Sequence, residues 1–208
     1  VYPLTLLDSL LASETAKVME NSYRSANIAF VEEWGRFAEA VGVDIFQVID
    51  AIRVRPTHNN IRQPGFGVGG YCLTKDPLFP GVAARDLLGR ADLTFPFCEA
   101  AVKTNKAMPI VSLDRMQQLL GGNLKAKRVL VMGVTYREDI ADTRHSPSET
   151  FVVEARRRGA DVIPHDPLVD EWHELEMTVE SILPPSDSID GIVFAVRHRI
   201  YSELDLKV

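Results

Sequence analysis

Residues 13–41, SETAKVMENSYRSANIAFVEEWGRFAEAV, decide the fold of the first half of this chain. Apolar side chains recur there at helical spacing, and Gly35 is the only glycine or proline in the stretch. One uninterrupted helix of this length would run on the order of 40 Å, longer than the core of a single domain usually requires. We therefore expect part of its apolar face to meet a second copy of the chain in a homodimer.

Further helices are predicted along the rest of this half. Gly42 is typical of a helix end, and a shorter helix is expected over Asp44–Arg53. Periodic apolar residues predict two more helices, over Leu78–Leu88 and Phe95–Leu120, with a break or kink at Pro109. The first half is thus expected to be all-α.

A βαβ pattern follows the glycine turn at Gly121-Gly122-Asn123. The apolar run in Arg128–Gly133 is typical of a buried parallel strand. A helix over Ser148–Arg158 and strands over Asp161–His165 and Gly191–Val196 complete the alternation of a doubly wound sheet. The expected fold class is α + α/β: an all-α central dimerisation domain over residues 1–121, then a Rossmann-like domain over residues 122–208.

Composition excludes several classes of function. The chain of 208 residues is 46% hydrophobic and carries a net charge of −6, which argues against a nucleic-acid surface. No apolar run approaches 18 residues, so we expect no membrane insertion. The histidines lack metal-ligand spacing, and we assign no metal.

The segment Gly65–Pro77, GFGVGGYCLTKDP, holds the densest chemistry. Its glycines can turn sharply and let backbone N–H groups approach an anion. Lys75 would favour the thiolate of Cys72, and Asp76 would lie one helical turn from it. A buried, inert cysteine is the structural alternative. A nucleophilic thiol requires reducing surroundings, so we expect the cytoplasm.

Three segments resemble the UDP-glucose/UDP-N-acetylmannosamine dehydrogenase family, in the order in which that family has them. Gly69–Pro77 is similar to its cysteine motif, Glu14–Asn27 to the start of its central helix, and Gly133–Pro147 to the opening of its UDP-binding domain. Together they extend over nearly the whole chain.

The resemblance implies oxidation of the C6 hydroxymethyl of a UDP-hexose to a carboxylate, a reaction of polysaccharide biosynthesis. Two NAD⁺ take part, and Cys72 forms a thiohemiacetal and then a thioester. Lys17 and Asn21 match the family's active-site lysine and asparagine, and Asp76 would orient water or a lysine. These four are the expected catalytic residues.

The resemblance also implies binding roles for residues outside the catalytic set. Arg144 is expected to contact NAD. At Arg137 the family usually has lysine, which keeps the cation but changes its geometry. The expected UDP-sugar contacts are Arg55, Asn60, Phe66, Gly67, Gly69, Gly70 and Arg137.

No G-x-G-x-x-G fingerprint occurs in the chain, so the N-terminal NAD-binding domain of the family is expected to be absent from it. The start at Val1 and the end at Val208 both suggest truncation. We accordingly expect this chain alone to show no NAD-dependent activity.

Two alternatives stay open. The chain could be a non-catalytic dimerisation and nucleotide-sugar-binding module, or a hydrolase or acyltransferase that uses Cys72 without NAD. The identity of the sugar is open as well. Tyr71 and Lys75 favour UDP-glucose, whereas the spacing of Gly65–Gly70 favours a UDP-N-acetylhexosamine.

Overall fold

The computed structural model describes residues 4–204. Residues 1–3 and 205–208, which include both ends where truncation is expected, lie outside the described residues. The chain divides into two compact units. The first contains the residues up to 64 together with 72–105, and the second contains 65–71 together with the residues from 106 onward.

The first unit is built on the predicted long helix, α1 (Leu10–Val41). It begins at Leu10 rather than at Ser13 because the Ser9 hydroxyl accepts a hydrogen bond from the Ala12 N–H at 3.1 Å. Gly42 ends the helix in the left-handed region, with φ of 73°, where glycine carries no Cβ penalty. The expected long helix is thus confirmed.

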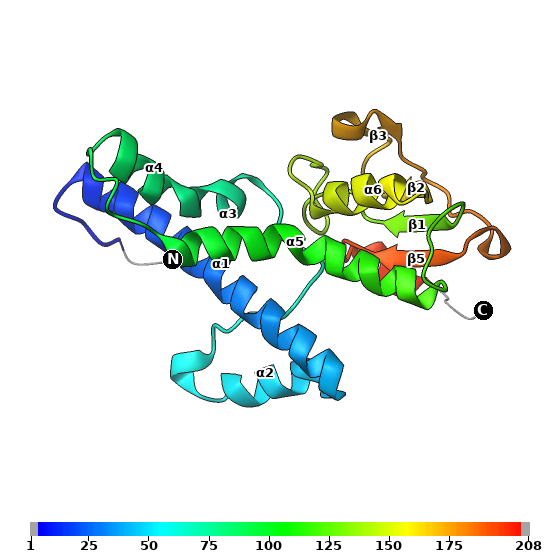
Figure 1. Ribbon diagram of the computed structural model, residues 1–208, viewed down its shortest axis with the longest axis horizontal. Coiled ribbons are helices and arrows are strands. Elements are labelled where there is room, and N and C mark those ends of the chain that lie inside the picture. Colours follow the sequence, from blue (N-terminus) through cyan, green and yellow to red (C-terminus); the bar gives the residue numbers. More distant parts are fainter. Residues whose placement is uncertain (1–3, 205–208) are drawn as a thin grey trace. The chain divides into compact units, whose positions relative to one another are not determined.

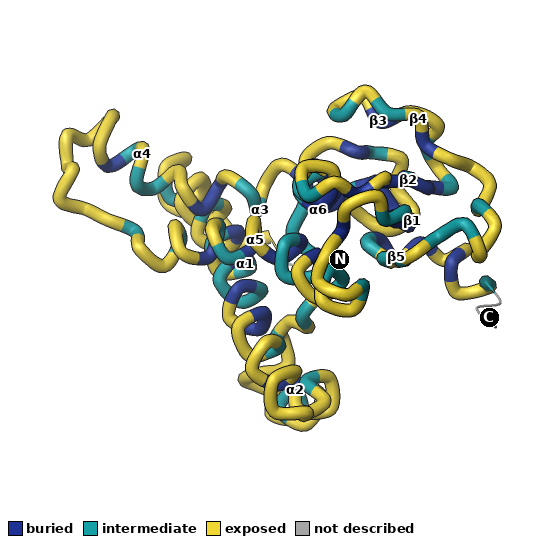
Figure 2. Tube along the Cα trace, turned by 45° about the vertical axis from the view of Figure 1, so that its right-hand side comes forward, coloured by how far each residue is buried: buried dark blue, intermediate teal, exposed yellow. Residues whose placement is uncertain are grey.

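Shorter helices pack along α1. Figure 1 shows α4 (Phe79–Asp86) beside its N-terminal part and α2 (Ile45–Arg53) beside its C-terminal end. Asp44 caps α2 by accepting the Phe46 N–H at 2.9 Å. The other helical elements up to residue 119 are the 3₁₀ turn η1 (Pro56–His58), α3 (Tyr71–Lys75), the 3₁₀ turn η2 (Asp76–Leu78) and α5 (Pro96–Leu119). Much of α1 and α2 is exposed, as Figure 2 shows in yellow.

The sequence predicted a break or kink at Pro109. Helix α5 continues through that residue, so no break occurs, and the kink remains a prediction. Its residues from Lys106 onward belong to the second compact unit, in which Leu113 is fully buried. The domain boundary expected after residue 121 remains a prediction. The chain does turn there, with φ of 86° at Gly121 and 83° at Gly122.

The second unit contains a three-stranded parallel sheet in the order β2-β1-β5. The strands are β1 (Arg128–Met132), β2 (Asp161–His165) and β5 (Gly191–Phe194), with Arg128 opposite Asp161 and Val129 opposite Gly191. Helix α6 (Pro147–Arg157) is the crossover between β1 and β2. All three predicted strands and this helix are confirmed.

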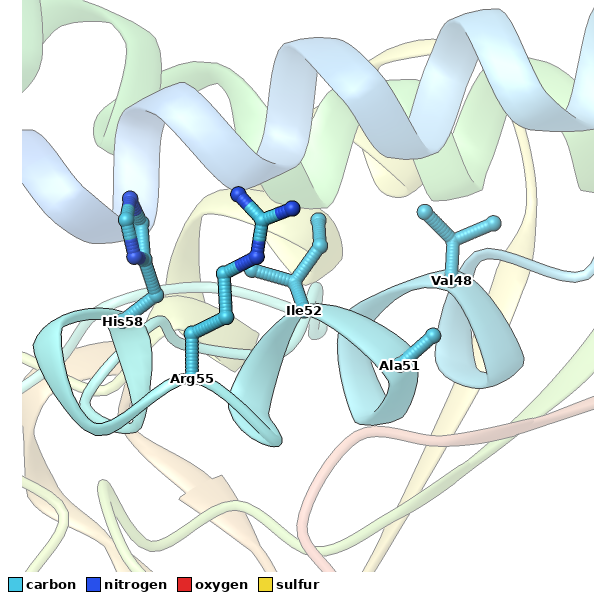
Figure 3. A pocket seen from close by; sticks show the side chains of 5 residues that line it. All are labelled: Val48, Ala51, Ile52, Arg55 and His58. Carbon is cyan, nitrogen blue, oxygen red and sulfur yellow. The ribbon is translucent and has the colours of Figure 1, made fainter.

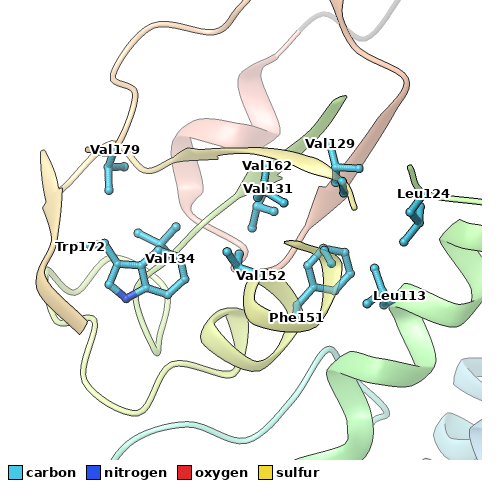
Figure 4. Packing of buried hydrophobic residues seen from close by; sticks show 12 residues of the cluster. Leu113, Leu124, Val129, Val131, Val134, Phe151, Val152, Val162, Trp172 and Val179 are labelled. Atoms are coloured by element: carbon cyan, nitrogen blue, oxygen red, sulfur yellow. The ribbon is translucent and has the colours of Figure 1, made fainter. Parts of the chain in front are cut away.

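Both faces of β1 are covered, which explains its apolar sequence. Val129 and Val131 face a cluster with Phe151 of α6 and Leu113 of α5 (Figure 4). Leu130 and Met132 alternate to the opposite face, where Tyr201 covers them. This two-sided burial is the pattern of a doubly wound sheet.

A short hairpin of β3 (Glu171–Trp172) and β4 (Met177–Thr178) was not predicted. Two-residue strands are too short to give an alternating pattern. Trp172 is nevertheless fully buried in the same cluster as Phe151.

We expect Gly133→Ala to destabilise the second unit by about 3 kcal/mol. Gly133 has φ of 99°, and an added Cβ would lie 2.4 Å from the Val196 Cβ. Gly122→Ala is the control, because its φ is 83° but nothing lies within 4 Å, so only a backbone cost of about 1 kcal/mol remains. Urea unfolding followed by Trp172 fluorescence, in a Trp34→Phe background, measures both. Equal losses would refute the role of the close contact.

Candidate functional site

Three of the four expected catalytic residues form one hydrogen-bonded cluster in the first unit. The Asn21 Nδ2 donates to the Asp76 Oδ2 at 2.8 Å, and the Lys17 Nζ donates to the Asn21 Oδ1 at 3.3 Å. Asn21 is fully buried and Asp76 nearly so, whereas Lys17 is exposed. The buried amide therefore links the carboxylate to an ammonium at the surface.

Helix α1 and the turn η2 position this cluster. Lys17 and Asn21 are four residues apart on α1, so they share one face. Asp76 begins η2 directly after α3, and its Oδ1 lies 3.2 Å from the Lys75 Nζ. A carboxylate held between an amide and an ammonium is fixed in orientation.

Cys72 lies in the first turn of α3 and is exposed. Among the described contacts it shares no hydrogen bond with Lys17, Asn21 or Asp76. The Lys75 ammonium, expected to favour the thiolate, contacts Asp76 and lies 4.7 Å above the Phe79 ring. The structure thus places the thiol in a helical segment that ends at Lys75, immediately before Asp76, and leaves it accessible.

Arg55 lines an open groove of about 510 Å³ together with four other residues of the first unit. In Figure 3 the Arg55 and His58 side chains rise on the same side as Ile52 and Val48. Two nitrogen-rich side chains beside an apolar wall suit a ligand that has both an anionic and an apolar part.

Asn60 holds its own loop to α1. Its Nδ2 donates to the Tyr23 Oη at 2.7 Å, and its carbonyl accepts from the Asn27 Nδ2 at 3.4 Å. The Asn27 Oδ1 in turn accepts the Arg62 N–H at 3.0 Å. The amide that was expected to contact the sugar therefore has a structural partner here.

The glycines of the cysteine loop belong to the second unit, where they permit close packing. An added Cβ at Gly67 would lie 2.4 Å from the Pro147 Cβ, and one at Gly69 would lie 2.8 Å from the His145 carbonyl oxygen. Gly70 adopts φ of 79° and donates its N–H to that same oxygen at 3.2 Å. Any ligand role of these glycines remains a prediction alongside this packing role.

Phe66, also expected to contact the sugar, packs against Phe151 with ring centroids 5.6 Å apart. It is half-buried and joins the core of the second unit. The Phe66 ring therefore contributes to the packing of this core, and its contact with the sugar remains a prediction.

Two arginines follow β1 in a long loop. Arg137 is exposed, and its carbonyl accepts the Thr135 hydroxyl at 3.2 Å. The Arg144 guanidinium pairs with both carboxylate oxygens of Asp142, at 2.9 and 2.7 Å, and lies 5.5 Å above the Tyr71 ring. This pairing lowers the pKa of Asp142 to about 2. A ligand anion at Arg144 would have to share the guanidinium with that carboxylate.

The turn after β1 does not fit the diphosphate of NAD. In a dinucleotide-binding turn the backbone N–H groups face the ligand. Here the Val134 and Thr135 N–H groups donate to the Asp166 Oδ2 at 2.9 and 3.2 Å. Helix α6 begins only at Pro147, so no glycine turn leads directly into it.

Asp166 and His198 are the residues whose importance the sequence analysis missed. Asp166 forms a turn, in which the Leu168 N–H donates to its Oδ1 at 3.0 Å. The Asp166 Oδ2 also lies 3.1 Å from the His198 Nε2. One signal could have found them: both follow predicted strands, and the carboxyl ends of parallel strands share one edge of the sheet.

Neither a metal site nor a membrane span occurs in the part of the chain that the structure describes. No three His, Cys, Asp or Glu side chains gather there as metal ligands would. None of the described helices combines the length and the apolar character needed to cross a membrane.

Comparison with known families gives residues 12–107 as the central domain of the UDP-glucose/GDP-mannose dehydrogenase family. Residues 130–208 match the UDP-binding domain of the same family. The chain belongs to the UDP-glucose/GDP-mannose dehydrogenase family. The resemblance noted in the sequence is thereby confirmed.

Relatives within this family act on different sugars, as their names state. The chain is 33% identical over 196 residues to the UDP-N-acetyl-D-mannosamine dehydrogenase of Pyrococcus horikoshii, covering 92% of this chain and 43% of that protein. It is 28% identical over 207 residues to the UDP-glucose 6-dehydrogenase of Rickettsia felis, covering 96% and 45%. The chain thus spans less than half the length of these relatives.

The fold agrees with a solved structure of the family. A UDP-glucose dehydrogenase from Pyrobaculum islandicum superimposes with a TM-score of 0.82 at 26% identity, covering 94% of this chain and 46% of that one. The expected fold class, a helical domain followed by a Rossmann-like parallel sheet, is therefore confirmed.

In this member of the family we expect Asp76→Ala to lower the free energy of unfolding of the first unit by about 1–3 kcal/mol. The substitution leaves the buried Asn21 amide without its acceptor. Urea unfolding followed by far-UV circular dichroism measures the change. Asp86→Ala is the control, because Asp86 is an exposed carboxylate paired with the adjacent Arg85, and its removal should not move the midpoint. Equal unfolding midpoints for both variants would contradict a stabilising role of the Asn21–Asp76 hydrogen bond.

Proposed function

We propose that this chain is part of an NAD-dependent dehydrogenase that oxidises the C6 hydroxymethyl of a UDP-hexose to a carboxylate. UDP-glucose and a UDP-N-acetylhexosamine are the two substrate candidates. The Lys17–Asn21–Asp76 cluster, next to the helix that holds Cys72, is the observation that carries this proposal. Membership in a family of nucleotide-sugar dehydrogenases supports it.

Cys72 acts in the second of two oxidations. Its sulfur bonds to the carbonyl carbon of the C6 aldehyde, and the oxygen takes a proton, which gives a thiohemiacetal. Loss of a hydride and a proton from that carbon and oxygen leaves a thioester. Water then attacks the thioester, the thiol leaves, and the carboxylate forms. The exposed position of Cys72 leaves the sulfur open to the aldehyde.

In this proposal the Lys17 ammonium stabilises the negative charge that develops on the carbonyl oxygen. This ammonium is exposed, whereas Asn21 is buried beneath it and holds it through the Oδ1. A positioned cation stabilises negative charge that forms on the carbonyl oxygen. Asp76 orients the Asn21 amide from the other side and places an acceptor near an attacking water.

NAD⁺, as two molecules for each product, would accept the two hydrides. The turn after β1 does not fit its diphosphate, so we assign the main NAD site to a part of the parent protein outside the present chain. Arg144 remains the residue proposed to contact NAD from this chain, and Arg137 the one proposed to contact the UDP.

Cys72→Ser in the full-length parent should slow acid formation by several orders of magnitude. A serine hydroxyl keeps nearly the same size but is a far weaker nucleophile at neutral pH. The first hydride transfer requires no thiol and should persist. Rapid-quench analysis of a single turnover, which detects enzyme-bound aldehyde, measures both steps.

Cys98→Ser is the matched control, because Cys98 is the other free cysteine and lies half-buried in the first unit. It should form acid at the parental rate. Acid formation by Cys72→Ser at a near-parental rate would remove Cys72 as the nucleophile. If the full-length parent reduced no NAD with any UDP-sugar, the non-catalytic binding module would be the better description.

We also propose that the chain forms a homodimer through α1. Four apolar side chains at helical spacing remain about half exposed on one face: Phe30 at 54%, Trp34 at 50%, Phe37 at 57% and Val41 at 53%. Phe30, Trp34 and Phe37 contact one another in sequence along the helix, with ring centroids 6.3 and 5.7 Å apart. A contiguous aromatic face of this kind favours burial against a partner.

Sedimentation velocity at tens of micromolar should show a dimer of the 208-residue chain, and Trp34→Glu should give monomers. Burying a new carboxylate against a partner costs several kcal/mol. Ala40→Glu adds the same charge on another side of α1 and should leave the dimer intact. A folded, monomeric parent chain would refute the interface.

A further inference from the structure

One buried imidazole joins three segments at the carboxyl edge of the sheet. His198 follows β5 and is 1% exposed. Its Nε2 lies 3.1 Å from the Asp166 Oδ2, after β2, and 3.1 Å from the Thr135 Oγ1, after β1. Its Nδ1 accepts the Asp139 N–H at 3.0 Å. Both ring nitrogens are thus engaged by residues far apart in the sequence.

The bonding partners assign the tautomer of the neutral ring. Because the Asp139 N–H donates to the Nδ1, the proton lies on the Nε2 and points toward Asp166. The Thr135 hydroxyl donates to the Arg137 carbonyl at 3.2 Å, so its oxygen faces the Nε2 as a second acceptor. Asp166 therefore holds the Val134 and Thr135 N–H groups directly, whereas His198 holds the Asp139 N–H.

The segment held in this way has a backbone shape that most residues avoid. Asp139 adopts φ of 55°, in the left-handed region. The His198 ring fixes its N–H, and the Arg199 N–H fixes its side chain at 3.1 Å from the Oδ1. Residues 134–139, which include Arg137, thus depend on contacts from the segment after β5.

We propose that Asp166 and His198 are a positioning pair that shapes residues 134–139 and so presents Arg137 to the diphosphate of the nucleotide. This rests on the proposed function, which places Arg137 at the UDP. In open parallel sheets, ligands bind outside the carboxyl ends of the strands, which is the edge where the pair lies. The pair sets the affinity for the nucleotide and takes no part in the chemistry at Cys72.

Two amide substitutions separate the two bonds of the imidazole. His198→Asn keeps an acceptor where the Nδ1 lies and can still hold the Asp139 N–H, but it cannot reach Asp166 as a donor. His198→Gln keeps a donor toward Asp166 but offers no acceptor to Asp139. If the bond to the Asp139 N–H is what shapes residues 134–139, His198→Asn should keep that shape and His198→Gln should lose it.

The test is titration calorimetry of UDP into the 208-residue chain. We expect the unsubstituted 208-residue chain to bind UDP. The dissociation constant of His198→Asn should lie within about threefold of that chain's value, and that of His198→Gln should be on the order of tenfold higher. Amide hydrogen exchange should be faster over residues 135–139 in His198→Gln alone. His173→Ala, which removes an exposed imidazole in the same unit, is the control and should leave the affinity unchanged.

Each result decides one question. UDP affinity unchanged in a folded His198→Gln, or equal weakening in both variants, overturns the positioning pair while the proposed function stands. Lower thermal stability in both variants with an unchanged dissociation constant for UDP shows a structural role only and also overturns it. If the unsubstituted 208-residue chain does not bind UDP at millimolar concentration, both the proposed nucleotide site and this inference are overturned.

Discussion

Burial of β1 on both faces is the constraint on which the second unit depends. Val129 and Val131 meet one cluster of apolar side chains while Leu130 and Met132 meet another, so every residue of the strand after Arg128 is buried. The backbone groups of a strand enclosed in this way must be hydrogen-bonded within the sheet. Strand β1 therefore lies in the centre and pairs in parallel with β2 on one side and β5 on the other. The parallel arrangement then brings the ends of all three strands to one edge, where chemistry from distant parts of the sequence can meet.

At that edge a carboxylate occupies donors that a dinucleotide-binding fold would leave for its ligand. Asp166 accepts the N–H groups of Val134 and Thr135, so the backbone after β1 is already satisfied. A buried carboxylate requires such donors, because an uncompensated charge would be costly. In this chain the carboxyl edge of the sheet therefore holds the long loop between β1 and α6, which carries Arg137 and Arg144. It forms no glycine turn of the kind that binds NAD.

The first unit distributes polar and apolar residues in an unusual way. Helix α1 buries Asn21, Ser25 and Glu32 while its aromatic side chains face outward. Burial raises the pKa of Glu32, although Arg36 lies 3.3 Å from its carboxylate. Polar groups inside a unit are costly unless they are bonded, and Asn21 and Ser25 are bonded to Asp76 and Asn105. Helix α1 therefore buries hydrogen-bonded polar side chains and leaves aromatic ones exposed.

The sequence by itself determined the elements whose signal is local. The long helix, its end at Gly42, the strands over 128–132 and 161–165, and the grouping of Lys17 with Asn21 all follow from spacing within a few residues. Only the tertiary structure decided which distant groups meet. Asp76 lies 55 positions from the asparagine that it binds, Gly67 is packed on Pro147, and His198 reaches Asp139 across 59 positions. No local pattern encodes such contacts, because they arise only when packing brings the ends of distant strands and helices beside one another. A residue such as Asp166 acquires its contacts only there.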